Sequence, residues 1–175
     1  MQKLKNFIID LDGVMTDGRF YYTAEGKVMK AFGADDHDAI LLLKKYMNVF
    51  FVTGDKKGFE ISKKRIVDDM KMPLELVSTV ERVRWLEDNG YKPGESIYMG
   101  DGIFDAMVFD KVGYSIAPAN GFYTTKAKAD FVTPSIGGYG AVAEACLHIM
   151  EKFFVPFDPL NIELEKSSGE WGNTK

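Results

Sequence analysis

Two acidic pairs each follow an apolar run of the chain. Asp10 and Asp12 come at and after the end of "NFIID", and Asp101 and Asp105 come after "SIYMG". Carboxylates so close repel each other, and burying them without a partner would cost several kcal/mol. A divalent cation would offset that repulsion, and Mg²⁺ commonly binds one or two carboxylates together with water and substrate phosphate. The acidic pairs therefore predict a metal site and phosphoryl chemistry.

A threonine and a glycine between these pairs fit the same chemistry. Thr53 and Gly54 stand at the end of the run "NVFFVT", where a hydroxyl and a backbone N–H become available to a phosphate oxygen. In an open α/β sheet, ligands bind outside the carboxyl ends of the strands. Three apolar runs thus end in groups that could meet at one such edge.

The elements that would position these groups alternate along the chain. Expected strands are 6–10, 48–53, 96–101 and 113–117, and expected helices are 38–47, 59–70, 104–112 and 121–129. Such alternation predicts an α/β fold with a doubly wound, mostly parallel sheet covered by helices on both faces. A further helix is expected over 79–89, because Ser78 and Glu81 match a capping box and Gly90 matches a helix end.

One segment interrupts the alternation. Residues 18–32, "GRFYYTAEGKVMKAF", place two aromatic and β-branched runs around "AEGK", which predicts a β-hairpin between the first strand and the first helix. Its large apolar side chains exceed what a small hairpin can bury against its own domain. They are Phe20, Tyr21, Tyr22, Val28, Met29 and Phe32. The hairpin is expected to be a flap over a site or an oligomer contact.

Composition limits the class of protein. The 175 residues are 46% hydrophobic and 27% charged, as in soluble globular proteins, and one domain over 1–155 with a tail over 156–175 is expected. The first apolar run stops at Asp10, far short of a secretory signal or membrane span, so a cytoplasmic location is expected. A net charge of -4 argues against nucleic-acid binding, and the single cysteine, Cys146, excludes a disulfide framework.

Four short stretches closely resemble, in order, the four motifs of the haloacid dehalogenase superfamily of phosphatases. They are "DLDGVMTD" (10–17), "TG" (53–54), a basic residue within "STVERVRW" (78–85) and "GDGIFD" (100–105). The hairpin in place of a large cap domain is similar to the capless branch, whose members include octulosonate 8-phosphate and nonulosonate 9-phosphate phosphatases. The similarity extends over residues 5–152.

This resemblance implies roles for the four aspartates. Asp10 would be the nucleophile that forms an aspartyl phosphate, and Asp12 would protonate the leaving alcohol and then activate water. Mg²⁺ would be held by Asp10, the Asp12 carbonyl and Asp101, and Asp105 would support that metal site from behind.

The resemblance also implies a phosphate site, with departures from the family pattern. Thr53, the Gly54 N–H and Arg82 would bind the transferring phosphoryl group. Arg82 stands where the family usually has lysine, and it replaces a compact ammonium with a planar fork, with Arg84 as the neighbouring alternative. Gly102 takes the place of a second acid in the fourth motif.

The implied function is a Mg²⁺-dependent phosphatase for a small phosphorylated sugar acid, a 2-keto-3-deoxy sugar acid phosphate. Members of this branch form homotetramers through their hairpins, so the same is expected of residues 18–32. The departures at Arg82 and Gly102 leave open a catalytically altered binding or scaffold protein in sugar-acid synthesis. A phospho-receiver domain is a further alternative, although "NVFFVTG" offers no acceptor acid. The segment "FGADDHDAI" (32–40) leaves the identity of the sugar open.

Overall fold

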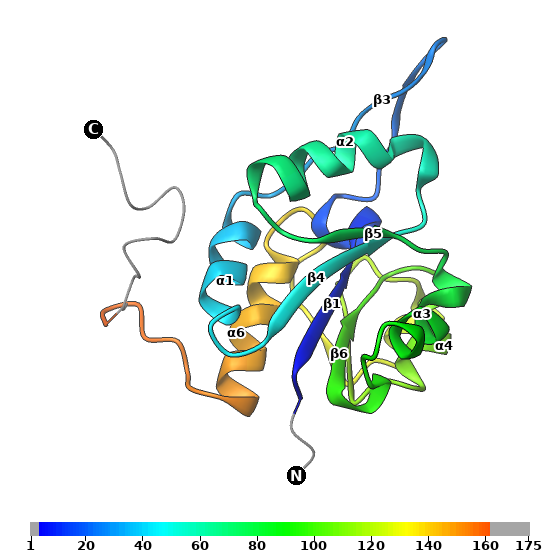
Figure 1. The fold of residues 1–175 in the computed structure, drawn as a ribbon. Coiled ribbons are helices and arrows are strands. Elements are labelled where there is room, and N and C mark those ends of the chain that lie inside the picture. The colour runs from blue at the N-terminus through cyan, green and yellow to red at the C-terminus, as the bar shows by residue number, and fades with distance from the viewer. Residues whose placement is uncertain (1–3, 162–175) are drawn as a thin grey trace.

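The computed structural model of the chain describes residues 4–161, and six strands form its main sheet (Figure 1). The order across the sheet is β5-β4-β1-β6-β7-β8, and every neighbouring pair is parallel. The strands are β1 (Asn6–Asp10), β4 (Asn48–Thr53), β5 (Leu74–Leu76), β6 (Ser96–Met99), β7 (Tyr114–Ala117) and β8 (Phe131–Val132). Parallel strands require crossover connections, and here these connections are helical.

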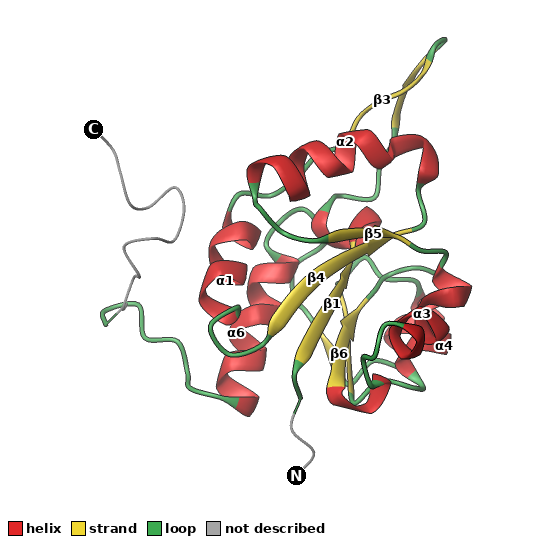
Figure 2. Cartoon of the chain, in the orientation of Figure 1, coloured by secondary structure: helices red, strands yellow, loops and turns green. Residues whose placement is uncertain are grey.

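Helices cover both faces of this sheet (Figure 2). They are α1 (Asp35–Leu43), α2 (Phe59–Lys63), α3 (Arg82–Asp88), α4 (Asp105–Phe109), α5 (Tyr123–Lys126) and α6 (Ala141–Phe153). Shorter helical turns are η1 (Leu11–Met15), η2 (Lys56–Gly58), η3 (Lys64–Asp69), η4 (Thr79–Glu81) and η5 (Pro93–Glu95). Helices α1 and α6 pack together on one face, and α3 and α4 lie on the other (Figure 1). The predicted α/β fold class is confirmed.

The sheet separates the core into two apolar clusters, because successive side chains of a strand point to opposite faces. Phe7 and Ile9 of β1 belong to the cluster that contains residues of α1 and α6, whereas Ile8 belongs to the cluster on the α3 side. Every residue of β1 is buried, as a central strand covered on both faces requires. This rigid central strand delivers Asp10 to the carboxyl edge of the sheet.

The predicted elements agree with the structure where apolar runs are long. The expected strands 6–10 and 48–53 coincide with β1 and β4. Strands β5 and β8 were not predicted, because three and two residues are too short to show a periodic pattern. The expected helix 38–47 begins earlier, at Asp35, so the acids of "ADDHD" form its first turn rather than preceding it.

The helix expected over 79–89 is present as η4 followed by α3, but its predicted capping box is wrong. The Ser78 side chain makes no capping hydrogen bond, and the Glu81 N–H instead donates to the Ser78 carbonyl at 2.9 Å. The chain therefore enters this segment through a tight 3-10 turn. Gly90 does end it, with φ of +78° in the left-handed region.

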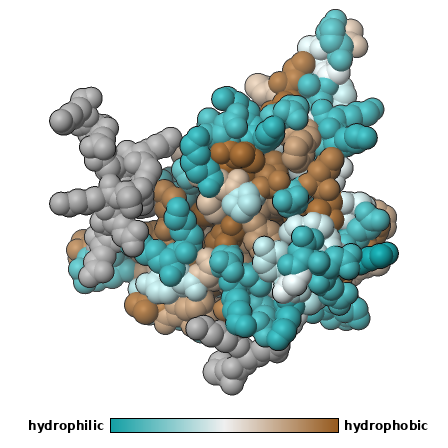
Figure 3. All heavy atoms as spheres, viewed as in Figure 1, coloured by the Kyte–Doolittle hydropathy of each residue, from teal (hydrophilic) through white to brown (hydrophobic). Residues whose placement is uncertain are grey.

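The predicted hairpin is formed by β2 (Tyr21–Thr23) and β3 (Gly26–Met29), and it projects from the body of the molecule (Figure 1). It displays both hydrophobic and hydrophilic side chains in the space-filling view (Figure 3). Tyr22 and Val28 are 58% and 52% exposed. Phe32 does not belong to the exposed set, because it packs against the core.

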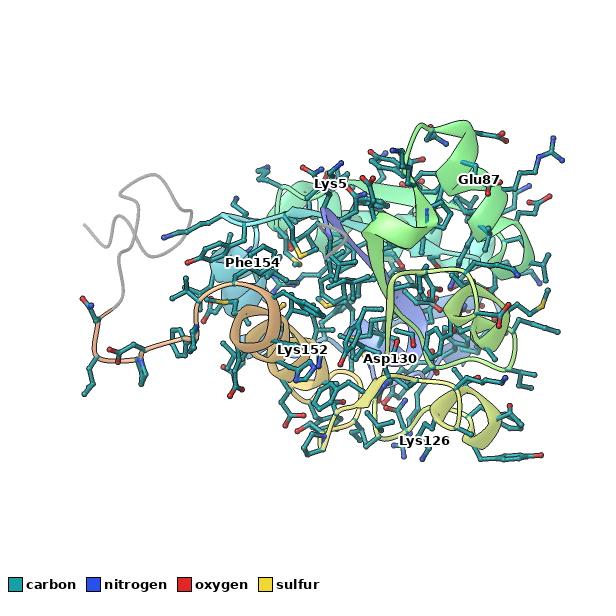
Figure 4. The ribbon with its side chains drawn as sticks, turned by 90° about the horizontal axis from the view of Figure 1, so that it is seen from below. Lys5, Glu87, Lys126, Asp130, Lys152 and Phe154 are labelled. Carbon is teal, nitrogen blue, oxygen red and sulfur yellow. The ribbon has the colours of Figure 1, made fainter. Side chains whose placement is uncertain are left out.

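The opposite, amino edge of the sheet is seen in Figure 4, with Lys5 before β1 and with Lys152 and Phe154 at the end of α6. Beyond α6, Phe157 still packs against the α1–α6 side of the core. The rest of the predicted tail, from residue 162 onward, lies outside the described residues. None of the helices within 4–161 combines the length and hydropathy that crossing a bilayer requires.

Candidate active site

Three of the predicted carboxylates meet at the carboxyl edge of the sheet. Asp10 ends β1, and Asp101 and Asp105 follow β6, which is the neighbouring strand. One carboxylate oxygen from each residue lies within 4.8 Å of the others. Asp105 is almost completely buried and Asp10 nearly so. The strand order thus assembles an acidic triad from segments about ninety residues apart.

The turn after β1 lies directly against this triad. Gly13 adopts φ of +88°, a conformation that is costly for residues with a side chain. A Cβ at this position would lie 2.1 Å from Asp101 Oδ2, so glycine is also required for space. The Asn120 side chain, after β7, donates to the Gly13 carbonyl at 2.9 Å and helps to fix the turn.

The environment of the triad opposes full ionisation. Burial raises the pKa of Asp10 to about 6, although the nearby Arg82 guanidinium lowers it. Burial, together with the charges of Asp10 and Asp105, raises the pKa of Asp101 to about 8. Concentrated negative charge of this kind is what a hard divalent cation with oxygen ligands neutralises, so the side chains present fit a magnesium site.

Arg82 supplies a positive charge beside Asp10 and Asp105. It is the first residue of α3, and only 2% of it is exposed. Its Nη1 lies 2.9 Å from Asp10 Oδ2, and its Nη2 donates to Asp10 Oδ1 at 3.0 Å. The alternative candidate, Arg84, is exposed and pairs with Asp88 at 3.5 Å. The structure therefore brings Arg82, and not Arg84, to the site.

Asp105 holds Arg82 and the loop after β6 in place. Its Oδ1 accepts hydrogen bonds from Arg82 Nη1 at 3.0 Å and from the Tyr98 hydroxyl at 2.7 Å. Its Oδ2 accepts from the Gly102 N–H at 2.8 Å. Burial raises the pKa of Tyr98 well above its ordinary value, which keeps this hydroxyl a donor. Gly102, the departure from the family pattern, thus contributes its backbone to the site.

Asp12 lies beside Thr53. The Thr53 hydroxyl, at the end of β4, donates to Asp12 Oδ2 at 3.1 Å. Burial raises the pKa of Asp12, and the nearby Lys30 ammonium lowers it. Gly54 follows Thr53 in an exposed position at the same edge of the sheet. Thr53, Gly54 and Asp12 therefore lie where a phosphate could approach Asp10.

Sequence reasoning missed four polar residues at or near this site. Lys30 lies 2.7 Å from Asp12 Oδ1 and 2.8 Å from Asp55 Oδ2. Tyr98 contacts Arg82, and Asn120 contacts Gly13. For Asn120 and Asp55 a signal existed, since both come shortly after the ends of strands. Lys30 and Tyr98 carried none, because their burial depends on distant parts of the chain.

Comparisons with known proteins decide the family. The sequence model of the haloacid dehalogenase-like hydrolases matches residues 78–145. The 3-deoxy-D-manno-octulosonate 8-phosphate phosphatase of Salmonella typhi is 31% identical over 154 residues, which are 83% of this chain and 78% of the relative. The Escherichia coli K12 enzyme of the same name is 30% identical over the same shares. The chain belongs to the haloacid dehalogenase-like hydrolases.

Solved structures place this hydrolase in the same group. The 3-deoxy-D-manno-octulosonate 8-phosphate phosphatase of Yersinia pestis superposes with a TM-score of 0.72 at 29% identity, over 86% of this chain and 82% of that one. The enzyme of that name from Moraxella catarrhalis, in complex with magnesium, phosphate and KDO, has a TM-score of 0.72 at 26% identity, over 86% and 87%. The predicted phosphomonoesterase class is confirmed.

Proposed function

We propose that this hydrolase removes phosphate from a small phosphorylated sugar acid, a 2-keto-3-deoxy sugar acid phosphate such as octulosonate 8-phosphate or a nonulosonate 9-phosphate. The observation that carries the proposal is Asp10, which contacts the Arg82 guanidinium and belongs to one acidic cluster with Asp101 and Asp105. The substrate class is supported by the names of the relatives, which align with 83% of this chain.

Asp10 acts as the nucleophile. Its carboxylate attacks phosphorus, the bond between phosphorus and the sugar oxygen breaks, and an aspartyl phosphate forms. Arg82 holds both oxygens of Asp10, so the attacking carboxylate is oriented before substrate binds. The same guanidinium also binds the transferring phosphoryl group, whose charge is spread over its equatorial oxygens.

Asp12 moves the protons. Its carboxyl group gives a proton to the departing sugar oxygen and later takes one from the water that hydrolyses the aspartyl phosphate. The raised pKa of Asp12 favours a protonated form at the first step. The Thr53 hydroxyl, which contacts Asp12, and the Gly54 N–H bind phosphoryl oxygens.

Mg²⁺ is the cofactor that the acidic triad fits. Asp10, Asp101 and the carbonyl of Asp12 would hold it, and the ion would neutralise phosphate charge so that one anion can approach another. Asp105 supports this arrangement indirectly, since its oxygens fix Arg82 and the Gly102 N–H. A catalytically altered scaffold has less support, because the Arg82 and Gly102 departures both keep contacts within the site.

Substrate specificity requires more contacts to the sugar acid than this edge of the sheet offers. The tip of the hairpin projects away from the domain, and Tyr22 and Val28 are exposed on it. We propose a homotetramer in which hairpins pack together and a neighbouring subunit closes each site, as the resemblance to the capless branch implies. Such closure would supply contacts to the sugar acid.

The test is phosphate release by the purified protein with and without Mg²⁺ on octulosonate 8-phosphate, nonulosonate 9-phosphates and simple sugar phosphates. We expect Mg²⁺-dependent release from one sugar acid and loss of at least ~10³-fold in Asp10→Asn, which removes covalent catalysis. Asp88→Asn, an exposed aspartate on α3, is the matched control and should keep full activity. Activity retained in Asp10→Asn would refute the mechanism.

A further inference from the structure

Lys30 is a buried lysine that no role in the proposed reaction accounts for. It follows β3, and its side chain is 0% exposed. A buried ammonium is costly unless it is paired and hydrogen-bonded. Here Nζ lies 2.7 Å from Asp12 Oδ1 and 2.8 Å from Asp55 Oδ2, and it donates to Ser62 Oγ at 2.9 Å. One hydrogen bond and two close carboxylate contacts thus surround the ammonium group.

The partners of Lys30 other than Asp12 are themselves fixed. Asp55 Oδ1 accepts from the Gly58 N–H at 3.1 Å, and the Ser62 hydroxyl donates to the Gly58 carbonyl at 3.1 Å. A second hairpin lysine, Lys27, lies 2.5 Å from Asp55 Oδ2 with 3% of its side chain exposed. The Lys30 ammonium is therefore held by the segment that follows β4, independently of Asp12.

Both carboxylate oxygens of Asp12 therefore contact groups that other parts of the chain hold in place. Thr53 donates to Oδ2 at 3.1 Å, and Lys30 contacts Oδ1 at 2.7 Å. Two contacts on opposite oxygens fix the rotation of a carboxyl group, which one contact cannot do. Productive proton transfer requires such orientation, and a displacement of about 1 Å can cost ~10²-fold in rate.

We propose that Lys30 is a positioning residue that holds the Asp12 carboxyl group against the leaving oxygen of the substrate. This inference rests on the proposed function. As the bond from Asp10 to phosphorus forms, the bond from phosphorus to the ester oxygen breaks, and the Asp12 proton passes to that oxygen. A sugar alkoxide needs this proton, whereas 4-nitrophenolate leaves readily without it. Loss of Lys30 should therefore affect the two kinds of substrate differently.

The experiment compares kcat/KM for the sugar acid phosphate that the wild type hydrolyses fastest and for 4-nitrophenyl phosphate, because kcat/KM excludes the later hydrolysis of the aspartyl phosphate. We expect Lys30→Met to lose ~10²-fold or more on the sugar phosphate and less than ~10-fold on the aryl phosphate, in line with the usual contribution of a positioned acid. The matched control is Lys27→Met, which removes a second hairpin lysine, 3% exposed and bonded to Asp55. In Lys27→Met, kcat/KM should fall by the same factor for the sugar phosphate and the aryl phosphate.

The ratio of the two kcat/KM values does not depend on how much of a preparation is folded, so partial misfolding cannot imitate the expected result. An equal loss on both substrates in Lys30→Met, or the same change of ratio in Lys27→Met, would show that Lys30 is merely structural. If the wild type hydrolyses none of the sugar acid phosphates tested above in the presence of Mg²⁺, the proposed function fails, and the role of Lys30 fails with it.

Discussion

The Arg82 guanidinium contacts both carboxylate oxygens of Asp10, with Nη1 2.9 Å from Oδ2 and Nη2 3.0 Å from Oδ1. The same Nη1 donates to Asp105 at 3.0 Å. A lysine ammonium is a compact point charge on a flexible stem, so it could not make these contacts in one fixed geometry. Arginine at this position therefore binds the nucleophile and its supporting acid together.

Removal of Arg82 should unbalance the buried charges. We expect Arg82→Ala to lower the free energy of unfolding by about 3–5 kcal/mol, because it leaves Asp10 and Asp105 as uncompensated buried acids. Phosphate release should be lost. Arg82→Lys should retain the charge but lose the fork geometry, with an intermediate fall in kcat/KM. Urea unfolding and phosphate-release assays measure both effects.

The control for this change is Arg84→Ala on the same helix. The Arg84 side chain is 84% exposed and makes only a surface ion pair with Asp88. Surface pairs contribute little, so its free energy of unfolding should change by less than about 0.5 kcal/mol. Similar losses of stability in Arg82→Ala and Arg84→Ala would contradict the charge balance described for the site.

Alanine substitutions at Gly13 and Gly90 separate the cost of the backbone conformation from the cost of crowding the site. Both have positive φ, but a Cβ at Gly13 would overlap Asp101, whereas nothing lies within 4 Å of one at Gly90. Alanine at either position should cost roughly 1–2 kcal/mol of stability from the backbone conformation alone. Only Gly13→Ala should also abolish phosphate release and the thermal stabilisation by Mg²⁺. Unchanged activity in Gly13→Ala would be inconsistent with a metal site at Asp101.

Sequence reasoning found the residues that chemistry and strand ends mark together. Asp10, Thr53 and Asp101 come at or directly after buried apolar runs, and parallel topology brings such ends to one edge whatever the order of the strands. Their common edge could thus be predicted from the sequence, whereas their closeness follows from the strand order, in which β1 lies between β4 and β6. The spacing of Asp12 and Asp105 from these ends added two more residues of the site.

What sequence reasoning could not predict depends on contacts between distant segments. Lys30 lies in a hairpin run with exposed neighbours, where a lysine normally faces solvent, and its burial follows from Asp12, Asp55 and Ser62. The sequence favoured Arg82 but left Arg84 open as an alternative, because the face that α3 turns to the sheet separates the two. The capping box at Ser78 failed because a local pattern does not fix the geometry of the turn.

The exposed hairpin gives a prediction about assembly. Tyr22 and Val28 are more than half exposed, and serine at both positions should weaken contacts between hairpins. We expect light scattering to give four times the chain mass for the wild type and a smaller mass for Tyr22→Ser/Val28→Ser. Val80→Ser, at a 58% exposed valine in η4, is the matched control and should leave the mass unchanged. A monomeric wild type would exclude closure of the site by a neighbour.

Asp101 links stability to pH in the absence of metal. Its pKa is about 8 in the folded protein and 3.8 ordinarily, so between these values the folded state binds more protons than the unfolded chain. Stability must then fall as pH rises through this window, because ionisation is easier in the unfolded state. We expect the Tm of the metal-free protein to decrease from about pH 6.5 to about pH 8.5, above the range in which Asp10, with a pKa of about 6, titrates.

Mg²⁺ should reverse this trend, because it binds ionised carboxylates and its affinity therefore increases with pH. A concentration 100-fold above Kd stabilises by about 2.7 kcal/mol, which is several degrees in Tm for a domain of this size. The increase in Tm on adding Mg²⁺ should be larger at about pH 8.5 than at about pH 5.5. In Asp101→Asn the residue cannot ionise, so thermal melts should show neither the fall in Tm between about pH 6.5 and 8.5 nor the stabilisation by Mg²⁺. If the Tm of Asp101→Asn still fell over this pH range, the pH dependence of stability would belong to another group.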